Sequence, residues 1–322
     1  MKAIQVTQPG GPEALTLVDL PNPEPTQNEA VVGIKAAGVN FIDVYYRGGR
    51  YPSPLPFTVG QEGAGVVSAI GSDVTNLKVG DRVAYTGVLG GYAECAAVPA
   101  DRLVKIPDDL DFYQAAAAML QGMTAHYLSH STYAIKEGET VLIHAAAGGV
   151  GSLLVQMAKH LGARVIGTAG SEAKAQLARD AGADEVIIYT TQDFETETRR
   201  LTDGDGVNVV YDGVGKTTFE KDLNVLRPRG YLVLYGASSG AVPAVDPMVL
   251  NKKGSIYLTR PSLHHYIHTR EELEDRSTAV LKMVAQGTLT LRIHKIYPLS
   301  EAATAHRDLE GRKTTGKLLL SP

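Results

Sequence analysis

The chain has 322 residues, of which 44% are hydrophobic and 20% are charged, and its formal net charge is -4 at pH 7. These values are ordinary for a soluble globular protein, and the length suits two domains of about 150 residues each. No apolar run approaches the ~20 residues needed to cross a bilayer. The slightly acidic balance argues against a protein whose main role is to coat nucleic acid.

The N-terminal segment MKAIQVTQPGGPE lacks the apolar core of a signal peptide, so we expect the chain to begin folding at residue 1. Cys95 is the only cysteine, which excludes an intrachain disulfide and a zinc site built from several cysteines. A reducing, cytoplasmic setting is the simplest inference.

Short alternating runs broken by glycine and proline dominate the sequence up to about residue 105. Examples are EAVVGIKAAGV, GAGVVSAIG and GDRVAYT, and runs of this kind predict strands joined by turns. The simplest interpretation is a barrel-like, mainly β domain. The alanine-rich stretch FYQAAAAMLQGMTAHYLSHSTYAI that follows predicts helices leading away from this domain.

From about residue 138, predicted strands and helices alternate. TVLIHA, ARVIGTAG and DEVIIYT are strand-like, and GSLLVQMAKHLG and SEAKAQLARDAG between them are helix-like. VNVVYDGV, GYLVLYGA and SIYLT continue the series of strands. This alternation predicts an α/β domain with a doubly wound parallel sheet and helices on both faces.

The C-terminal region begins with a predicted helix. Thr269 and Glu272 have the spacing of a capping box, which marks a helix start. The tail HKIYPLSEAATAHRDLEGRKTTGKLLLSP predicts a strand, a helix and a final strand. Three histidines, His264, His265 and His268, precede this region; because they follow TRPSL and precede the cap, we expect a loop between domains rather than a metal site.

The most specific motif is the glycine-rich turn in TVLIHAAAGGVGSLLVQMAKHLG. A buried strand enters it, and a helix expected to begin near Ser152 leaves it. Gly148 and Gly151 occupy two of the three glycine positions of the dinucleotide fingerprint, and Ala146 occupies the first. Small residues let the backbone approach a pyrophosphate, and the helix N-terminus attracts its charge. We therefore predict a dinucleotide site.

The end of the next strand indicates which dinucleotide binds. NAD-binding units place an acid there, but no acid occurs before Glu172. Gly170, Ser171 and Lys174 instead offer amides and an ammonium to the 2′-phosphate of NADP, and Tyr189 could cover the same group. The competing interpretation is that Lys174 is only a solvated lysine on a helix and that Tyr189 is only an aromatic residue at the end of a strand. We favour NADPH as the cofactor.

Several longer motifs show a family resemblance that runs nearly end to end. They are AAGVNFIDVYYRGGRYP, LPFTVGQEGAGVV, HAAAGGVG, VVYDGVGKTTF, GSIYLTRPSL and the terminal YPLSEAATAHRDLEGRKTTGKLLL. With them the chain resembles the zinc-free, zeta-crystallin-like quinone oxidoreductases of the medium-chain dehydrogenase/reductase superfamily. The resemblance implies a GroES-like catalytic domain over residues 1–122 and 264–322 and a Rossmann NADPH-binding domain over residues 123–263, with the nicotinamide in the cleft between them.

The resemblance also implies a set of cofactor contacts. Besides Gly148, Gly151 and the 2′-phosphate group above, the matching positions are Asn40, Phe41, Ile42, Tyr45, Tyr127, Gly149, Val150, Val214, Tyr235, Gly236, Thr259, Arg260, Pro261 and Arg312. A surface arginine is a serious competing interpretation for Arg312.

Two of the matching positions bear on metal binding. In zinc relatives, a cysteine stands where this chain has Asn40 and a histidine stands where it has Gln61. Neither amide is a usual zinc ligand, and the four-cysteine lobe of those relatives is missing. The resemblance therefore implies that the chain is zinc-free and that Gln61 faces the electron acceptor.

Without a metal to polarise a carbonyl, we expect hydride transfer from NADPH to an acceptor that is already electrophilic, such as a quinone. Asn40, Tyr45 and Gln61 are the candidate catalytic residues, and Tyr45 is the one able to donate a proton. One alternative is a reductase of alkenals, enones or 2-enoyl thioesters. An alternative of another class is an NADPH-regulated RNA-binding protein of the zeta-crystallin type, against which the net charge speaks mildly.

The resemblance also implies an assembly. GYLVLYGA and GSIYLT are expected at the edge of the nucleotide sheet, where a second copy could pair to make a homodimer. Pairing with a second copy would cover this apolar edge, which would otherwise be open to aggregation. We expect no membrane partner.

Overall fold

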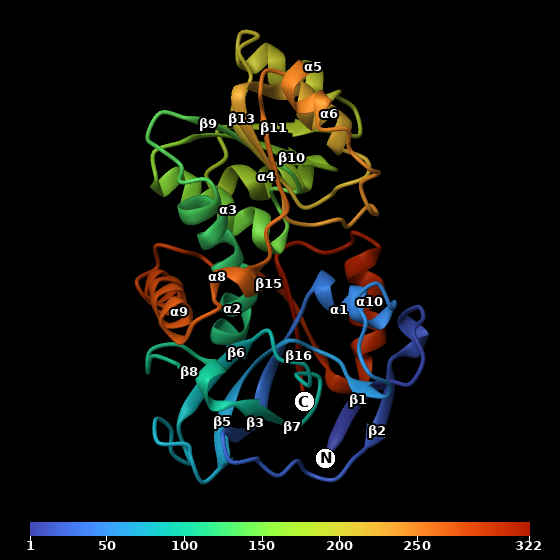
Figure 1. Cartoon of the computed structure of the whole chain (residues 1–322), viewed down its shortest axis with the longest axis vertical. Coiled ribbons are helices and arrows are strands. Elements are labelled where there is room, and N and C mark those ends of the chain that lie inside the picture. The colour runs from blue at the N-terminus through green and yellow to red at the C-terminus, as the bar shows by residue number, and fades with distance from the viewer. The chain divides into compact units, whose positions relative to one another are not determined.

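The computed structural model describes residues 1–322, which divide into two compact units. The first unit comprises residues 1–123 and 267–322, and the second comprises residues 124–266. In Figure 1 the first unit has the blue and red ends of the colour range, and the second has its green-to-orange middle.

The first unit is mainly β, as its alternating runs predict. Its larger sheet has the order β15-β16-β3-β5-β6-β8, and β7 pairs with β3 as well. A three-stranded sheet has the order β2-β1-β4. The strands are β1 (Lys2–Val6), β2 (Thr16–Asp19), β3 (Glu29–Val39), β4 (Phe57–Thr58), β5 (Glu62–Ile70), β6 (Arg82–Thr86), β7 (Cys95–Pro99), β8 (Val104–Lys105), β15 (Ile293–Pro298) and β16 (Lys317–Ser321).

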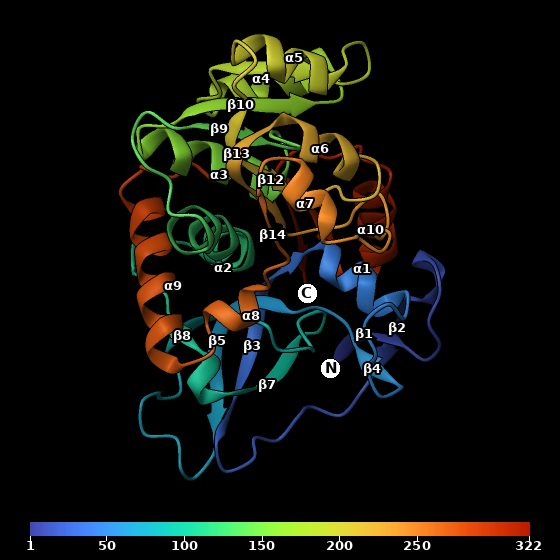
Figure 2. The same ribbon diagram turned by 45° about the horizontal axis from the view of Figure 1, so that its top comes forward.

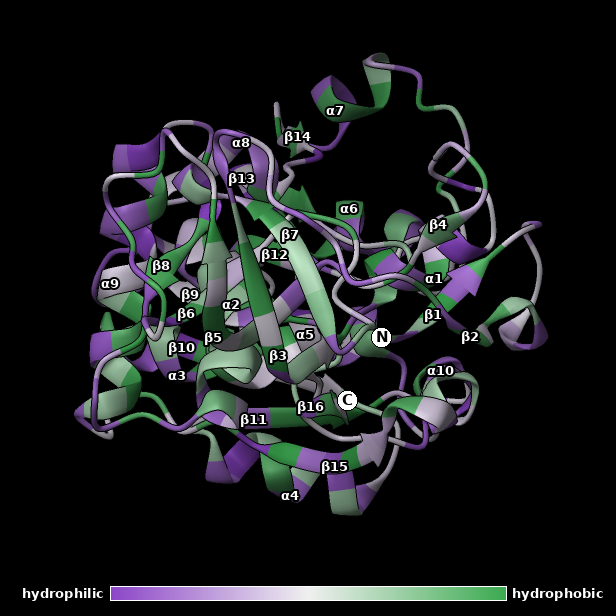
Figure 3. Ribbon diagram, turned by 90° about the horizontal axis from the view of Figure 1, so that it is seen from below, coloured by the Kyte–Doolittle hydropathy of each residue, from purple (hydrophilic) through white to green (hydrophobic).

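β3 is the centre of this sheet, because β5, β7 and β16 all pair with it in antiparallel fashion. The pairing with β5 depends on glycine: a Cβ on Gly65 would lie 2.1 Å from the carbonyl oxygen of Gly33. The inward side chains of these strands form one core that includes Val32, Tyr85 and Leu320. Figure 3 shows hydrophobic stretches along β3 and β5 and hydrophilic residues on α9.

Helices complete the first unit. They are η1 (Pro12–Ala14), α1 (Phe41–Arg47), η2 (Ala100–Arg102), α2 (Phe112–Tyr127, which crosses the division between the units), α9 (Arg270–Ala285), η4 (Leu299–Glu301) and α10 (Ala302–Glu310). The predicted cap of α9 is confirmed, since the Thr269 side chain accepts a hydrogen bond from the Glu272 amide and the Glu272 carboxylate accepts one from the Thr269 amide.

The second unit contains a parallel six-stranded sheet with the order β11-β10-β9-β12-β13-β14. Its strands are β9 (Thr140–Ile143), β10 (Arg164–Ala169), β11 (Glu185–Ile188), β12 (Val207–Asp212), β13 (Leu226–Leu234) and β14 (Tyr257–Thr259). Its other elements are η3 (Leu128–Thr132), α3 (Gly149–His160), α4 (Glu172–Asp180), α5 (Phe194–Leu201), α6 (Phe219–Val225), α7 (Met248–Lys252) and α8 (Leu263–Tyr266).

The helices of this unit pack in two pairs. α3 contacts α4, and α5 contacts α6. Figure 2 labels the four helices, with α4 and α5 uppermost. Since crossovers are right-handed and the chain reverses its direction along the sheet after β11, the two pairs cover opposite faces. The reversal lies between β9 and β12, and ligands of such sheets bind outside the carboxyl ends of the strands at this point. The predicted fold class is confirmed.

Two sequence-based expectations about local structure were wrong. α3 begins at Gly149 rather than near Ser152, because the last glycines of the turn themselves form the first helical turn, with Gly148 as the N-cap. His264 and His265, expected in a loop, lie in the short helix α8, which follows Pro261.

Candidate functional site

The candidate acceptor site lies in the first unit, around Asn40 at the junction of β3 and α1. Asn40 is the N-cap of α1, and its backbone N–H donates to the Asp43 carboxylate at 2.8 Å. The carboxylate thus satisfies an amide that the helix leaves without a partner. Asn40 and Asp43 form a capping box, and the Asn40 side chain has other contacts as well.

These contacts join Asn40 to a buried ion pair. Its Nδ2 donates to Glu62 Oε2 at 2.8 Å, and its Oδ1 accepts from Lys317 Nζ at 2.7 Å. Lys317 also donates to Glu62 Oε2, and the backbone amide of Leu120 donates to Glu62 Oε1 at 2.5 Å. Asn40, Glu62 and Lys317 are 4%, 0% and 2% exposed. Such charges are tolerated out of water only when paired and hydrogen-bonded.

Gln61 and Tyr45 are the other two candidate catalytic residues. Gln61 is 6% exposed and immediately precedes Glu62, but its side chain takes part in none of the bonds of the Asn40 cluster. Tyr45 is half-buried on α1, with its ring edge-on to Tyr51 at 5.6 Å and under the Arg50 guanidinium at 4.7 Å. Phe41 and Ile42 are half-buried in the first turn of α1.

A second buried network holds α1 from its other side. Arg47 Nη1 lies 3.1 Å from His306 Nδ1, His306 Nε2 lies 3.1 Å from the Tyr92 hydroxyl, and that hydroxyl donates to Asp43 at 2.9 Å. Because arginine can only donate, His306 Nδ1 is the acceptor and Nε2 carries the proton. The bonds therefore run in one direction, from Arg47 through His306 and Tyr92 to Asp43.

Burial shifts the pKa values of two members of this network, His306 and Asp43. Burial, helped by the Arg47 charge, lowers the pKa of His306 to about 3, so the ring is neutral. Burial raises the pKa of Asp43 to about 7, and the hydrogen bonds from Asn40 and Tyr92 reduce that rise. Arg47 is held in place by Glu310 through bonds of 2.8 and 2.9 Å.

The candidate cofactor site lies in the second unit and includes the turn between β9 and α3. A Cβ on Gly151 would lie 2.2 Å from the carbonyl oxygen of Ala145, and one on Gly148 would lie 3.0 Å from the same atom. Ala145 itself has a φ of 50°. The turn is therefore as tight as the fingerprint requires, and the first amides of α3, from Gly149 and Val150 onward, are available to an anion. These residues fit the pyrophosphate of a dinucleotide.

A buried histidine lies beneath this turn. His144 Nδ1 lies 3.0 Å from Thr168 Oγ1, and His144 Nε2 lies 2.7 Å from Asp222 Oδ1. Burial lowers the pKa of His144, but the charge and the hydrogen bond of Asp222, together with the Asp212 charge, outweigh it and the net shift is upward. Burial raises the pKa of Asp222 to about 7. This pair ties β9, β10 and α6 together under the turn.

The residues predicted to bind the 2′-phosphate lie close to the end of β10. Ser171 is the N-cap of α4, where its Oγ accepts from the backbone amide of Lys174 at 3.4 Å. Tyr189, 45% exposed, follows β11, and a Cβ on Gly170 would lie 2.6 Å from its hydroxyl. The four residues are thus neighbours at one edge of the sheet. An exposed helix N-terminus, a lysine and a phenol suit a phosphate.

The loops after β12 and β13 lie at the same edge of the sheet. Asp212, which ends β12, accepts hydrogen bonds from the amides of Val214 at 2.6 Å and Gly215 at 3.1 Å and from Thr218 Oγ1 at 2.9 Å. A Cβ on Gly236 would lie 2.5 Å from the carbonyl oxygen of Gly213. The two loops therefore pack without room for side chains between them, and Val214, Tyr235 and Gly236 have fixed positions.

The remaining predicted cofactor residues are more scattered. Tyr127 is 2% exposed and stacks on Tyr266 at 4.4 Å. Thr259 ends β14, and Arg260 donates to the Pro261 carbonyl at 3.1 Å. Arg312 lies in the first unit, between α10 and β16, with a φ of 55°.

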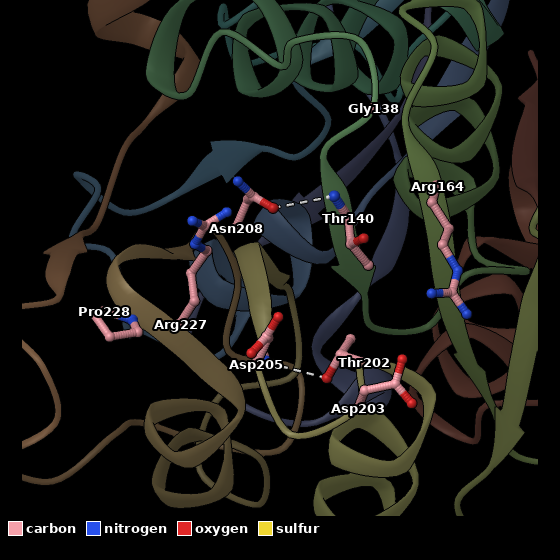
Figure 4. Close-up of a pocket in the computed structure, with 10 residues that line it drawn as sticks. Gly138, Thr140, Arg164, Thr202, Asp203, Asp205, Asn208, Arg227 and Pro228 are labelled. Atoms are coloured by element: carbon pink, nitrogen blue, oxygen red, sulfur yellow. Dashed lines mark hydrogen bonds between the residues drawn. The ribbon is translucent and has the colours of Figure 1, made fainter.

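A separate pocket lies at the opposite edge of the parallel sheet. It has a volume of about 440 Å³ and is lined by residues at or just before the starts of β9, β10, β12 and β13, including Thr140, Arg164, Asn208 and Arg227. Figure 4 shows Asn208 bonded to the Thr140 amide, at 3.1 Å. This is the amino edge of the strands, so the pocket is not where such a sheet holds a dinucleotide.

No group of three His, Cys, Asp or Glu side chains is placed to hold a metal ion. No helix is both long and apolar enough to span a membrane.

Sequence reasoning missed the residues that support Asn40: Lys317, Asp43, Tyr92 and His306. Lys317 carried one signal, a lone charge at the start of the apolar run KLLLS. Nothing in the sequence indicated which residues it would contact.

Comparison with known proteins identifies relatives over the whole chain. Residues 26–108 match the family described as "Alcohol dehydrogenase GroES-like domain", and residues 149–276 match "Zinc-binding dehydrogenase". The chain is 48% identical to a quinone oxidoreductase of Pseudomonas aeruginosa, covering 100% of this chain and 99% of that protein. It is 42% identical to a 2-haloacrylate reductase of a Burkholderia species, covering 99% and 98%.

A solved structure shows the same fold. The quinone oxidoreductase of Escherichia coli complexed with NADPH has a TM-score of 0.98 and 46% identity, with 100% of both chains covered.

Proposed function

The chain belongs to the quinone oxidoreductases of the medium-chain dehydrogenase/reductase superfamily, and from this premise we propose that it is an NADPH-dependent quinone reductase that needs no metal. The observation that carries the proposal is the identity of 46–48% over the full chain to quinone oxidoreductases. The fit of the second unit to NADPH supports it independently, through the tight glycine turn and the group at the end of β10.

We propose that the chain divides functionally into an acceptor-binding domain of residues 1–122 and 264–322 and an NADPH-binding domain of residues 123–263. In the second domain, the α3 amides of Gly149, Val150 and Gly151 bind the pyrophosphate. Gly170, Ser171, Lys174 and Tyr189 bind the 2′-phosphate. The remaining proposed cofactor contacts are Asn40, Phe41, Ile42, Tyr45, Tyr127, Gly148, Val214, Tyr235, Gly236, Thr259, Arg260, Pro261 and Arg312.

The reaction requires no covalent bond between the protein and the acceptor. Bound NADPH supplies the hydride. Asn40, Gln61 and Tyr45 offer N–H and O–H groups to the acceptor oxygen that gains negative charge, and a buried setting makes such hydrogen bonds stronger than in water. Tyr45 or solvent supplies the proton that completes the hydroquinone.

The proposal is tested by following NADPH oxidation with 1,4-benzoquinone and 9,10-phenanthrenequinone, with NADH as the matched cofactor control. We expect turnover with NADPH and a large preference for it over NADH. Absence of NADPH oxidation with every quinone tried would contradict the proposed function.

One observation favours a second candidate. The 42% identity to a 2-haloacrylate reductase extends over the whole chain, and that relative's substrate is an activated alkene. Conjugated enones and 2-haloacrylate therefore belong in the same acceptor panel. A higher kcat/KM for these alkenes than for quinones would replace quinone reduction as the main activity.

We also infer a homodimer formed through β14. This strand is the last of the parallel sheet, with β13 its only partner, and Tyr257 on it is 50% exposed and stacks on Tyr231 at 4.4 Å. An exposed edge of this kind can pair with a second copy. Sedimentation velocity is expected to give a dimer, and a pure monomer at micromolar concentration would reject it.

We further infer that the protein is zinc-free and cytoplasmic. The amides of Asn40 and Gln61 at the two positions discussed above are poor zinc ligands, and the single cysteine suits a reducing compartment. Metal analysis of untagged protein that found nearly one zinc per chain would contradict the first inference.

A further inference from the structure

We propose that Lys317 is a positioning residue that fixes the orientation in which the Asn40 side-chain amide meets the electron acceptor. The proposal rests on the quinone reductase function proposed above. It adds to that site a residue from the last strand of the first unit, β16.

The contacts leave only one assignment for the two ends of the amide. The atom 2.7 Å from Lys317 Nζ must be the oxygen, because an ammonium can only donate. The atom 2.8 Å from Glu62 Oε2 must be the nitrogen, because a carboxylate can only accept. Gln121 Nε2, 3.4 Å from Asn40 Oδ1, is consistent with the same assignment.

A flip of the amide is opposed from both sides. It would place the NH2 group against the ammonium of Lys317 and the oxygen against the carboxylate of Glu62. Since both charges are buried, water does not screen these contacts as it would at the surface. Lys317 and Glu62 also bond to each other, so each holds the other in place around Asn40.

This arrangement leaves one N–H of Asn40 for a ligand. Nδ2 carries two hydrogens, and the cluster uses one of them, in the bond to Glu62. The ammonium on Oδ1 polarises the amide and strengthens the remaining N–H as a donor. Such a preorganised donor is suited to the acceptor oxygen as it becomes negative. If the amide were free to rotate, this hydrogen bond would be lost for part of the time.

The test removes both charges together. Lys317→Met alone leaves the Glu62 charge buried without its counter-ion and endangers the fold, so the decisive variant is Lys317→Met with Glu62→Gln. We expect its kcat with quinone to fall about tenfold or more, because small errors of position are costly in hydride transfer. The Kd for NADPH should change by a much smaller factor than kcat, because Asn40 is only one of many proposed cofactor contacts. Lys105→Met, which removes the lysine of the exposed pair with Asp81, is the matched control and should keep the parental kcat.

A double-mutant cycle separates positioning from simple stabilisation. Asn40→Ala should reduce kcat in the parent but have little further effect in the doubly substituted background, because the amide there is already disordered. An equal effect of Asn40→Ala in both backgrounds, or a parental kcat in the doubly substituted variant, would overturn the proposal.

A readout without turnover covers the case in which the proposed function fails. In 15N-edited NMR spectra, the side-chain NH2 signals of Asn40 are identified by their loss in Asn40→Ala. They should move in the variant lacking both charges and stay in place in Lys105→Met. Unchanged signals would overturn the positioning role, whether or not quinones are reduced.

Discussion

The Tyr189 hydroxyl lies against Gly170, so closely that a Cβ on Gly170 would come within 2.6 Å of it. The two residues follow neighbouring parallel strands, β11 and β10, at the carboxyl ends of the strands. With the exposed N-terminus of α4 beside them, they form the group to which we assign selection of NADPH over NADH.

The first prediction concerns this selection. Lys174→Ala should raise the Kd for NADPH about 10- to 100-fold and leave the Kd for NADH nearly unchanged, because a hydrogen bond to a charged group contributes about 1.5–3 kcal/mol. Fluorescence titration with both cofactors measures the ratio. Arg179→Ala is the control on the same helix, where Arg179 pairs with Glu172. Equal weakening for NADPH and NADH would refute the assignment.

The second prediction concerns the glycine turn. Gly151→Ala should lower the free energy of unfolding by about 1–3 kcal/mol and weaken NADPH binding, because the new Cβ would lie 2.2 Å from the Ala145 backbone and the turn must shift. Gly33→Ala is the control, since its Cβ would meet its nearest neighbour at 3.6 Å. Urea unfolding and NADPH titration measure the two effects. Wild-type affinity in Gly151→Ala would show that the turn does not bind the cofactor.

The third prediction concerns Asp43. Its pKa is about 7 in the folded chain, against an ordinary value of 3.8. Between these pH values the folded chain keeps a proton that the unfolded chain releases, so this group costs stability as pH rises from about 4 to about 7. Asp43→Asn removes the titration. The free energy of unfolding of the variant should therefore rise relative to the parent over this range, as measured by urea unfolding at several pH values. A constant difference would be inconsistent with the raised pKa.

The fourth prediction has the opposite sign and concerns His306. Its pKa falls from an ordinary 6.5 to about 3 on folding. As pH drops below 6.5 the unfolded chain binds a proton that the folded chain does not, so stability is lost toward about pH 3. In His306→Gln this loss is absent, and the difference in unfolding free energy from the parent should change steadily between pH 6.5 and about 4. Because the two groups act in opposite directions, the free energy of unfolding of the parent should depend less on pH than that of either variant.

The sequence predicted the parts of this structure that depend on local signals. The cap of α9 at Thr269 and the two-domain fold follow from spacing and periodicity over a few residues, and both are confirmed. The start of α3 was placed three residues too late, because glycine is a poor helix former and its propensity argued against GVG as a first helical turn. There the tertiary fold overrides the local preference.

The support of the candidate site could not be predicted in the same way. Lys317 and Asn40 are 277 residues apart in the chain, and Tyr92 and His306 are 214 apart. No local pattern encodes such pairs; they form only because β16 pairs with β3 and α10 lies near α1. Gln61 and Asn40 looked equivalent as candidate hydrogen-bond donors, whereas the structure distinguishes them by the partners that Asn40 already has.

The place of β16 in the sheet has a consequence for synthesis of the protein. This strand lies between β15 and β3 and pairs with residues 37–39 of β3, on the edge where residues 29–33 pair with β7. Residues 37–39 therefore stay unpaired on this edge while more than 270 residues are translated. The second unit has its own sheet and core and can fold earlier on the ribosome. The cluster of Asn40, Glu62 and Lys317 must therefore be completed last, and a chain released before residue 317 is made would lack Lys317 and leave this end of β3 open to pairing with another chain.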